Sequence, residues 1–152
     1  MRVVLDTNIL VRANTLAKGP ARELLLRLAS SSHTLLMSSF LPDETERVLA
    51  YPGLRSRWLL TQEDIREHIE FLSQSSEMVP LPPGPRVVFK DSDDDAVIQT
   101  AVAGRADILC KLDQHFYDAR VKAFCEQRGI RIVSDVELLQ ELEGKPKAFR
   151  KV

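Results

Sequence analysis

The chain has 152 residues, carries a formal net charge of −1, and is 44% hydrophobic and 28% charged. This length and composition fit one ordinary globular domain and exclude a disordered or fibrous chain. The near-zero net charge excludes a global basic field of the kind that drives strong non-specific binding to nucleic acid.

The first part of the chain alternates between an apolar strand and amphipathic helices. Residues 2–5 are mainly β-branched and apolar, which predicts a buried parallel strand, and residues 7–17 can continue as a helix. Gly19 and Pro20 interrupt that pattern, and Pro20 suits the first turn of a second helix. The predicted buried face of this second helix consists of Ala21, Leu24, Leu25 and Leu28.

Residues 34–37 predict a second strand, after which Ser38 and Ser39 offer an N-cap for a helix. The predicted inward face of that helix consists of Leu41, Thr45, Val48 and Leu49. Residues 61–73 are the clearest helix of the sequence, because Thr61 and Asp64 match a capping box.

The second half of the chain continues the alternation. Its predicted elements are an extended connector around a short strand at 79–85, a helix at 96–103, a strand at 108–111, a helix at 119–128, a strand at 130–133, and a terminal helix after Ser134 and Asp135 with Val136, Leu139 and Leu142 apolar. The alternation predicts an α/β fold, a three-layer α/β/α sandwich around a mainly parallel central sheet. We expect a single domain over residues 1–143 and a basic C-terminal tail at 144–152.

The sequence also predicts where the protein resides. The chain reaches Asp6 too early for a signal peptide, and no uninterrupted apolar run is long enough to span a bilayer. Two cysteines, Cys110 and Cys125, do not make a disulfide framework and fit small core residues in a reducing compartment. We therefore expect a cytoplasmic protein without membrane contact.

Four separate segments each supply a carboxylate that can reach one place. Asp6 follows the first strand, Glu44 lies in the first turns of a helix, Asp94 lies in an acidic cluster at a helix start, and Asp113 follows a later strand. Ligands of parallel sheets gather at the carboxyl ends of the strands, so these side chains are predicted to converge. Hard cations such as Mg²⁺ and Mn²⁺ prefer oxygen ligands, and two such ions can assist attack on a phosphodiester.

Each acidic residue also has an ordinary structural interpretation. Asp6 can be a helix N-cap, Glu44 a first-turn charge favoured by the helix dipole, and Asp113 part of a turn. The acidic cluster at 91–95 can consist of capping residues and solvated charges. One such position means little, whereas four in this order on alternating strands and helices favour a common site.

Four sequence blocks resemble those of PIN-domain proteins, in the same order. The blocks are the strand running into Asp-Thr-Asn at 3–8, the serine and helix with an internal glutamate at 38–49, the acidic helix start at 91–107, and the strand ending in an acid at 108–113. A lone Asp-Thr-Asn would be weak evidence, but four blocks in register cover almost the whole chain. The resemblance is closest to nucleases that act as toxins of toxin–antitoxin pairs.

The resemblance implies an endoribonuclease that uses one or two Mg²⁺ or Mn²⁺ ions and a metal-activated water to cleave RNA. It also implies a homodimer and a small antitoxin protein as partners. Catalysis and metal binding are assigned to Asp6, Glu44, Asp94 and Asp113. Supporting roles are assigned to Thr7, Asn8, Ser39 and Asp95, and Lys111 and His115 are candidate substrate contacts.

One departure from the family pattern keeps a second class of function open. Lys111 and Leu112 stand where the family commonly has threonine and glycine. Lys111 can contact a phosphate, or it can replace a metal with its own charge, which would leave a catalytically impaired module that binds RNA or protein. A magnesium-dependent phosphatase of the haloacid dehalogenase type would want a second aspartate at Asn8, and a response-regulator receiver would want paired acids after the first strand. Both stay as alternatives.

Overall fold

The computed structural model describes residues 1–81, 92–111 and 119–144, and of residues 92–94 the backbone alone. In these residues five parallel strands form one sheet in the order β3-β2-β1-β4-β5. The strands are β1 (Arg2–Leu5), β2 (Thr34–Met37), β3 (Ser76–Met78), β4 (Ile108–Cys110) and β5 (Arg131–Val133). The helices are α1 (Thr7–Arg12), α2 (Pro20–Ser30), α3 (Phe40–Leu49), α4 (Pro52–Arg57), α5 (Gln62–Gln74), α6 (Ser92–Ala103), α7 (Ala119–Glu126) and α8 (Asp135–Leu142).

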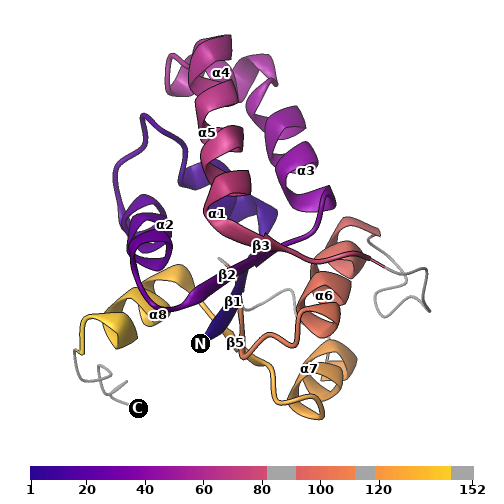
Figure 1. Ribbon diagram of the computed structural model, residues 1–152. Helices are drawn as coiled ribbons and strands as arrows, with labels where there is room; N and C mark the ends of the chain where they lie inside the picture. The colour runs from indigo at the N-terminus through magenta and orange to yellow at the C-terminus, as the bar shows by residue number, and fades with distance from the viewer. Residues whose placement is uncertain (82–91, 112–118, 145–152) are drawn as a thin grey trace.

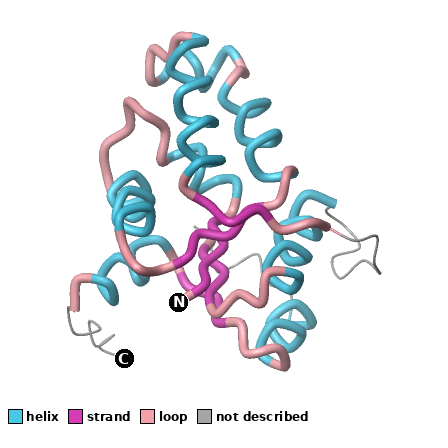
Figure 2. The backbone as a smooth tube through the Cα atoms, in the orientation of Figure 1, coloured by secondary structure: helices cyan, strands magenta, loops and turns pink. Residues whose placement is uncertain are grey.

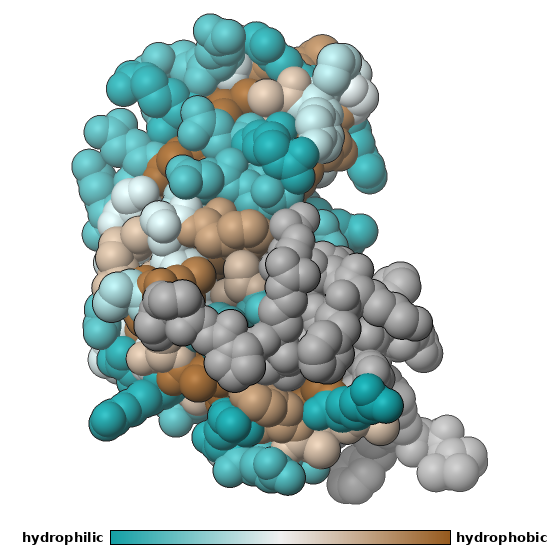
Figure 3. All heavy atoms as spheres, turned by 90° about the vertical axis from the view of Figure 1, so that its right-hand side faces the viewer, coloured by the Kyte–Doolittle hydropathy of each residue, from teal (hydrophilic) through white to brown (hydrophobic). Residues whose placement is uncertain are grey.

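Helices cover both faces of the sheet. Figure 1 shows α2 and α8 on one side of the strands and α6 and α7 on the other, with α3, α4 and α5 above them. The strands run through the middle of the molecule between these groups of helices (Figure 2). The predicted three-layer sandwich with a parallel sheet is therefore confirmed. Viewed from the side of α6 and α7, polar side chains cover the upper helices and apolar groups form smaller patches (Figure 3).

The sheet order creates a switch point between β1 and β4. The chain runs outward from β1 through β2 and β3, then crosses to the other side of β1 to form β4 and β5. At the boundary, Leu5 of β1 pairs with Cys110 of β4. In open parallel sheets, such a reversal leaves a crevice outside the carboxyl ends of the two strands, and ligands bind there. The topology alone therefore indicates where a site should lie.

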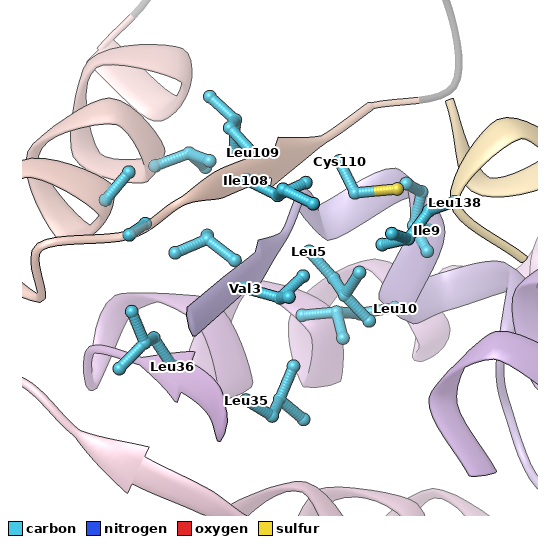
Figure 4. Close-up of a cluster of buried hydrophobic side chains, with 14 of the residues drawn as sticks. Val3, Leu5, Ile9, Leu10, Leu35, Leu36, Ile108, Leu109, Cys110 and Leu138 are labelled. Carbon is cyan, nitrogen blue, oxygen red and sulfur yellow. The ribbon is translucent and has the colours of Figure 1, made fainter. Parts of the chain in front are cut away.

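The core consists of the strands and the inward faces of the helices. Figure 4 shows Leu5 beside Leu10, and Cys110 beside Ile9 and Leu138. The four residues predicted for the buried face of α2 are all buried, as are both cysteines, which are free thiols. Burial of each such aliphatic side chain contributes about 1.5–3 kcal/mol relative to leaving it exposed.

Two predictions about helices in the first half are wrong. Helix α1 ends at Arg12 instead of continuing to residue 17, because Asn14 bonds the local backbone. Its Nδ2 donates to the Val11 carbonyl at 3.0 Å, and its Oδ1 accepts from the Leu16 N–H at 3.1 Å. The sequence pattern also missed α4, in which Pro52 takes the first helical position that proline suits.

Two further predictions are wrong in the placement of side chains and strands. The strand expected within 79–85 lies earlier, as β3. Glu77 and Met78 of this edge strand are exposed, so no apolar run in the sequence indicates it. Residues 82–85 lie outside the described residues. In α8, Val136 is 45% exposed and Leu138 is buried in its place. By contrast, the capping box of α5 is present in full, with Asp64 N–H donating to Thr61 at 3.0 Å and Thr61 N–H donating to Asp64 at 2.8 Å.

Among the described helices, none combines the length and the apolar character that crossing a membrane requires. The basic tail from residue 145 onward lies outside the described residues, so the predicted domain boundary stays a prediction.

Candidate functional site

Asp6 lies at the switch point. It directly follows β1, and its backbone N–H donates to the Cys110 carbonyl at 3.0 Å across the β1–β4 boundary. Its carboxylate Oδ1 accepts a 2.8 Å hydrogen bond from the Thr7 N–H, so Asp6 caps α1. The residue is only 5% exposed. The cap therefore holds a nearly buried carboxylate at the carboxyl edge of the sheet. The N-cap interpretation of Asp6 is confirmed, and its role in metal binding stays a prediction.

Lys111 occupies the corresponding place on β4. Because Leu5 pairs with Cys110, the register puts Lys111 level with Asp6 on the neighbouring strand. Lys111 is 8% exposed, and its backbone N–H donates to the Val133 carbonyl at 2.9 Å. Burial raises the pKa of the Cys125 thiol in α7, while the charges of Arg128 and Lys111 act against that rise. A buried ammonium offsets the charge of a carboxylate that lies close to it.

Asp135 is a third charged residue at this edge, and the sequence interpretation treated it only as a helix start. It follows β5 and Ser134, whose hydroxyl caps α8 by accepting from the Glu137 N–H at 3.1 Å. Asp135 is 7% exposed. Burial raises the pKa of the Cys110 thiol, and the charges of Asp135 and Asp6 raise it further. An acid just past the end of a parallel strand is the signal that could have identified Asp135, as it identified Asp6.

Glu44 is held by a neighbour on its own helix. Its side chain is 14% exposed and forms an i,i+3 ion pair in which Arg47 Nε donates to Oε2 at 3.0 Å and Arg47 Nη2 contacts Oε1. The Arg47 guanidinium also lies over the ring of Tyr51, with Cζ 5.4 Å from the ring centroid. Helix α3 packs against α1, so the helix that carries Glu44 neighbours the helix that Asp6 caps. A cation that bound Glu44 would compete with Arg47.

Helix α6 begins in the acidic cluster and packs against the sheet. It packs against β1, β2 and β4, and Asp94 is its third residue, followed by the partly buried Asp95. The side chain of Asp94 and the whole of Asp113 and His115 lie outside the described residues. Within the part of the chain that the structure describes, no three histidine, cysteine or carboxylate side chains form a group suited to a metal. The convergence of all four carboxylates therefore stays a prediction.

The predicted supporting residues differ in their placement. Thr7 is buried and Asn8 is exposed. Ser39 is also exposed; it is the N-cap residue of α3 but makes no capping bond, so the predicted cap is wrong. The reason is its helical backbone, with φ −59° and ψ −26°, whereas a capping residue normally has extended geometry.

Ser38, not Ser39, links two elements of the site. Its buried hydroxyl lies 2.8 Å from Thr100 Oγ1 of α6. Thr100 Oγ1 also donates to the Ala96 carbonyl at 2.8 Å, so the hydrogen of the first bond comes from Ser38. This bond fastens α6, and with it the acidic cluster, to the carboxyl end of β2.

Thr7 provides a test of whether the edge suits a cation. Its Oγ1 is buried and has no hydrogen-bond partner within the described structure. Unsatisfied buried hydroxyls are rare, and they occur where a water or an ion completes the set of contacts. A carboxylate and a hydroxyl oxygen on adjacent residues, Asp6 and Thr7, are the donor chemistry that a hard divalent cation and its waters prefer. The residues present therefore fit such an ion in kind.

Comparison with known proteins identifies a family. A family model described as PIN domain matches residues 2–115, well over half of the chain. The matched span starts in β1 and includes the segments that carry Asp6, Glu44, Asp94 and Asp113, while α7, β5 and α8 follow it. No curated protein matches the chain.

Proposed function

The chain belongs to the PIN-domain family, whose members are in general metal-dependent nucleases, and we propose that it is an endoribonuclease dependent on Mg²⁺ or Mn²⁺. The observation that supports this most is the nearly buried Asp6 carboxylate at the β1–β4 switch point, next to the unsatisfied Thr7 hydroxyl. A bound cation would stabilise a carboxylate at such a water-poor edge.

In this proposal Asp6, Glu44, Asp94 and Asp113 hold the ion or ions. When bound, the ion supplies Lewis-acid activation of a water and neutralisation of charge on the phosphate. The chain's own residues fix the geometry. The Thr7 N–H orients Asp6, and the Ser38–Thr100 bond holds α6 against β2. Asn8, exposed at the start of α1, is available to hydrogen-bond the phosphodiester, and direct in-line attack predicts inversion at phosphorus.

The role of a toxin with a small antitoxin and the homodimeric state belong to the same proposal, and the sequence resemblance is their support. A reading frame for a small protein next to this gene would support the toxin role, and a monomer in sedimentation experiments at micromolar concentration would contradict the dimer.

The decisive experiment measures RNA cleavage by the purified protein with Mn²⁺, with Mg²⁺ and with chelator. We expect cleavage only with metal, and its loss in Asp6→Asn, since asparagine still caps a helix well but binds cations weakly. Asp43→Asn is the matched control, because Asp43 is an exposed carboxylate on α3 near Glu44. Equal survival of RNA with metal and with chelator would refute the enzyme.

One observation favours a second candidate, a binding module of the same fold without catalysis. Lys111 is buried level with Asp6, where its ammonium can offset carboxylate charge in place of a metal. The two candidates differ in metal affinity: the nuclease should bind Mn²⁺, and Asp6→Asn should weaken that binding, whereas the module should bind little Mn²⁺ in either form.

A further inference from the structure

A recess shares one residue, Asp135, with the carboxyl edge of the sheet. It has a volume of about 260 Å³ and lies between the end of α1, the loop after it, the start of α2, the end of α4 and the start of α8. The loop between α1 and α2 arches on the left of Figure 1. The recess is lined by three cationic side chains, Arg12, Lys18 and Arg57, together with Trp58 and Asp135.

Among the described residues, the three cations have no acidic partner. Arg12, Lys18 and Arg57 are exposed, and none forms an ion pair or hydrogen bond within the described structure. The guanidinium of Arg57 instead lies over the Trp58 ring, with Cζ 5.2 Å from the ring centroid. By contrast, Arg27 of α2 pairs with Glu23 and Glu143. Cations from three separate segments that face one recess without carboxylate partners indicate a site for an anion.

The recess keeps a net positive charge when its other lining groups are included. Asp135 is its carboxylate, but it is 7% exposed and sits in the first turn of α8, where the helix dipole already stabilises it. Three cations against one carboxylate leave an excess of positive charge. The start of α2, which has no side-chain cap, also lines the recess and adds the partial positive charge of its N–H groups.

Asp135 and helix α1 relate the recess to the candidate active site. Asp135 lines the recess, and its charge also acts with that of Asp6 on Cys110. Helix α1 leads from Asp6 to Arg12 in six residues, which is roughly 9 Å of helix. A short stretch of a single strand bound at Asp6 can therefore reach the recess. A local cluster of this kind would also provide the backbone contact that a chain of net charge −1 lacks globally.

We infer that this recess binds a phosphate group of the RNA strand, next to the phosphate held at the candidate active site, with the Trp58 ring beside the bound strand. The inference rests on the proposed function and names where that substrate makes a second contact. A phosphate with three cationic side chains around it gains charge-assisted hydrogen bonds, and an aromatic ring adds contact with sugar or base.

Trp58 makes the test direct, because it is the single tryptophan of the chain. A non-cleaved oligoribonucleotide, titrated in the presence of chelator, should change the Trp58 fluorescence and yield an affinity. The double variant Arg12→Gln/Lys18→Gln should bind at least about tenfold more weakly, and its affinity should depend less on salt, by roughly 0.7 in the log–log slope for each lost contact. The control Arg105→Gln/Lys122→Gln removes the same charge from exposed positions outside the recess and should bind like the wild type.

The possible outcomes distinguish RNA from other anions in the recess, and they test the recess separately from the proposed enzyme. Equal weakening in both double variants would show a general charge effect and overturn the site. Inorganic phosphate that binds as tightly as the oligoribonucleotide would reassign the recess to a small anion, and tighter binding of polyglutamate would reassign it to an acidic protein segment; both results overturn the inference. Cleavage of RNA with an unchanged affinity in Arg12→Gln/Lys18→Gln would refute the recess alone. Binding through the recess without any cleavage would refute the enzyme alone.

Discussion

The buried histidine of α5 predicts a loss of stability in acid. His68 is 1% exposed, and its Nε2 lies 2.9 Å from the Leu10 carbonyl, which can only accept, so Nε2 carries the hydrogen. The other ring nitrogen, Nδ1, is buried without a partner in the described structure. Protonation of Nδ1 would place an uncompensated charge in the core between α5 and α1.

The size of the effect follows from the pKa. Burial lowers the pKa of His68 from 6.5 to about 4; the bond to Leu10 acts against this and the charge of Arg22 adds to it. Below pH 6.5 the unfolded chain binds a proton that the folded chain binds only near pH 4. The neutral His68 side chain therefore contributes fully to the unfolding free energy above pH 6.5, and this contribution is lost as the pH falls toward 4. Between pH 7.5 and 4.5 it amounts to about 2.5 kcal/mol of unfolding free energy.

Urea unfolding at several pH values between 7.5 and 4.5 measures this loss. His68→Gln keeps a donor for the Leu10 carbonyl but does not titrate, so its unfolding free energy should fall by about 2.5 kcal/mol less than that of the wild type over this range. Carboxylates titrate in both proteins and cancel in the comparison. His33→Gln, at a partly exposed histidine before β2, is the control for the same substitution outside the core. An identical pH dependence of His68→Gln and wild type would refute the reasoning.

Three further predictions concern packing and polar contacts. Gly104→Ala should cost about 1–3 kcal/mol, because a Cβ there would lie 2.9 Å from Leu36 Cδ1, whereas Gly53→Ala, with nothing within 4 Å, should be neutral or stabilising in urea unfolding. Ser38→Ala should destabilise by about 1 kcal/mol, and Thr100→Val by more, because it also leaves the Ser38 hydroxyl buried without an acceptor; thermal or urea unfolding of both variants checks the order. The two buried thiols should react with a disulfide reagent at pH 8 only at the rate of unfolding, and rapid labelling of the native protein would contradict the burial that raises their pKa.

The features that the sequence predicted well depend on neighbours along the chain. The capping box at Thr61 and the buried face of α2 follow from residue spacing alone, and both are present. The early end of α1 depends on the Asn14 side chain, which competes with the helix for hydrogen bonds to the backbone. The residue type alone does not predict this end, because asparagine also occurs inside helices. Local patterns thus identified most of the elements, but they missed α4, misplaced β3 and did not show where a polar side chain ends a helix.

The features that the sequence could not supply depend on the order of the strands. Alternation of strands and helices predicts a parallel sheet but does not say which strands are neighbours. The order β3-β2-β1-β4-β5 is what brings Lys111 level with Asp6 and puts Asp135 just past the end of β5, the next strand along. The sequence identified Asp6 because a motif surrounds it. Asp135 also follows a strand, but without such a motif it was interpreted as an ordinary first-turn charge of a helix.

A single substitution at Lys111 distinguishes the proposed nuclease from the binding module without catalysis. Lys111→Met removes the ammonium and keeps most of the buried side-chain volume. If the ammonium replaces a cation near Asp6, the variant should bind Mn²⁺ more tightly than the wild type, because carboxylate charge at the edge is then uncompensated. If Lys111 contacts a phosphate, Mn²⁺ affinity should stay unchanged while affinity for an oligoribonucleotide falls and its salt dependence decreases by about 0.7 in slope. A variant that alters neither affinity would show that the charge of Lys111 acts only toward Cys125 and α7, and both roles at the site would then be wrong.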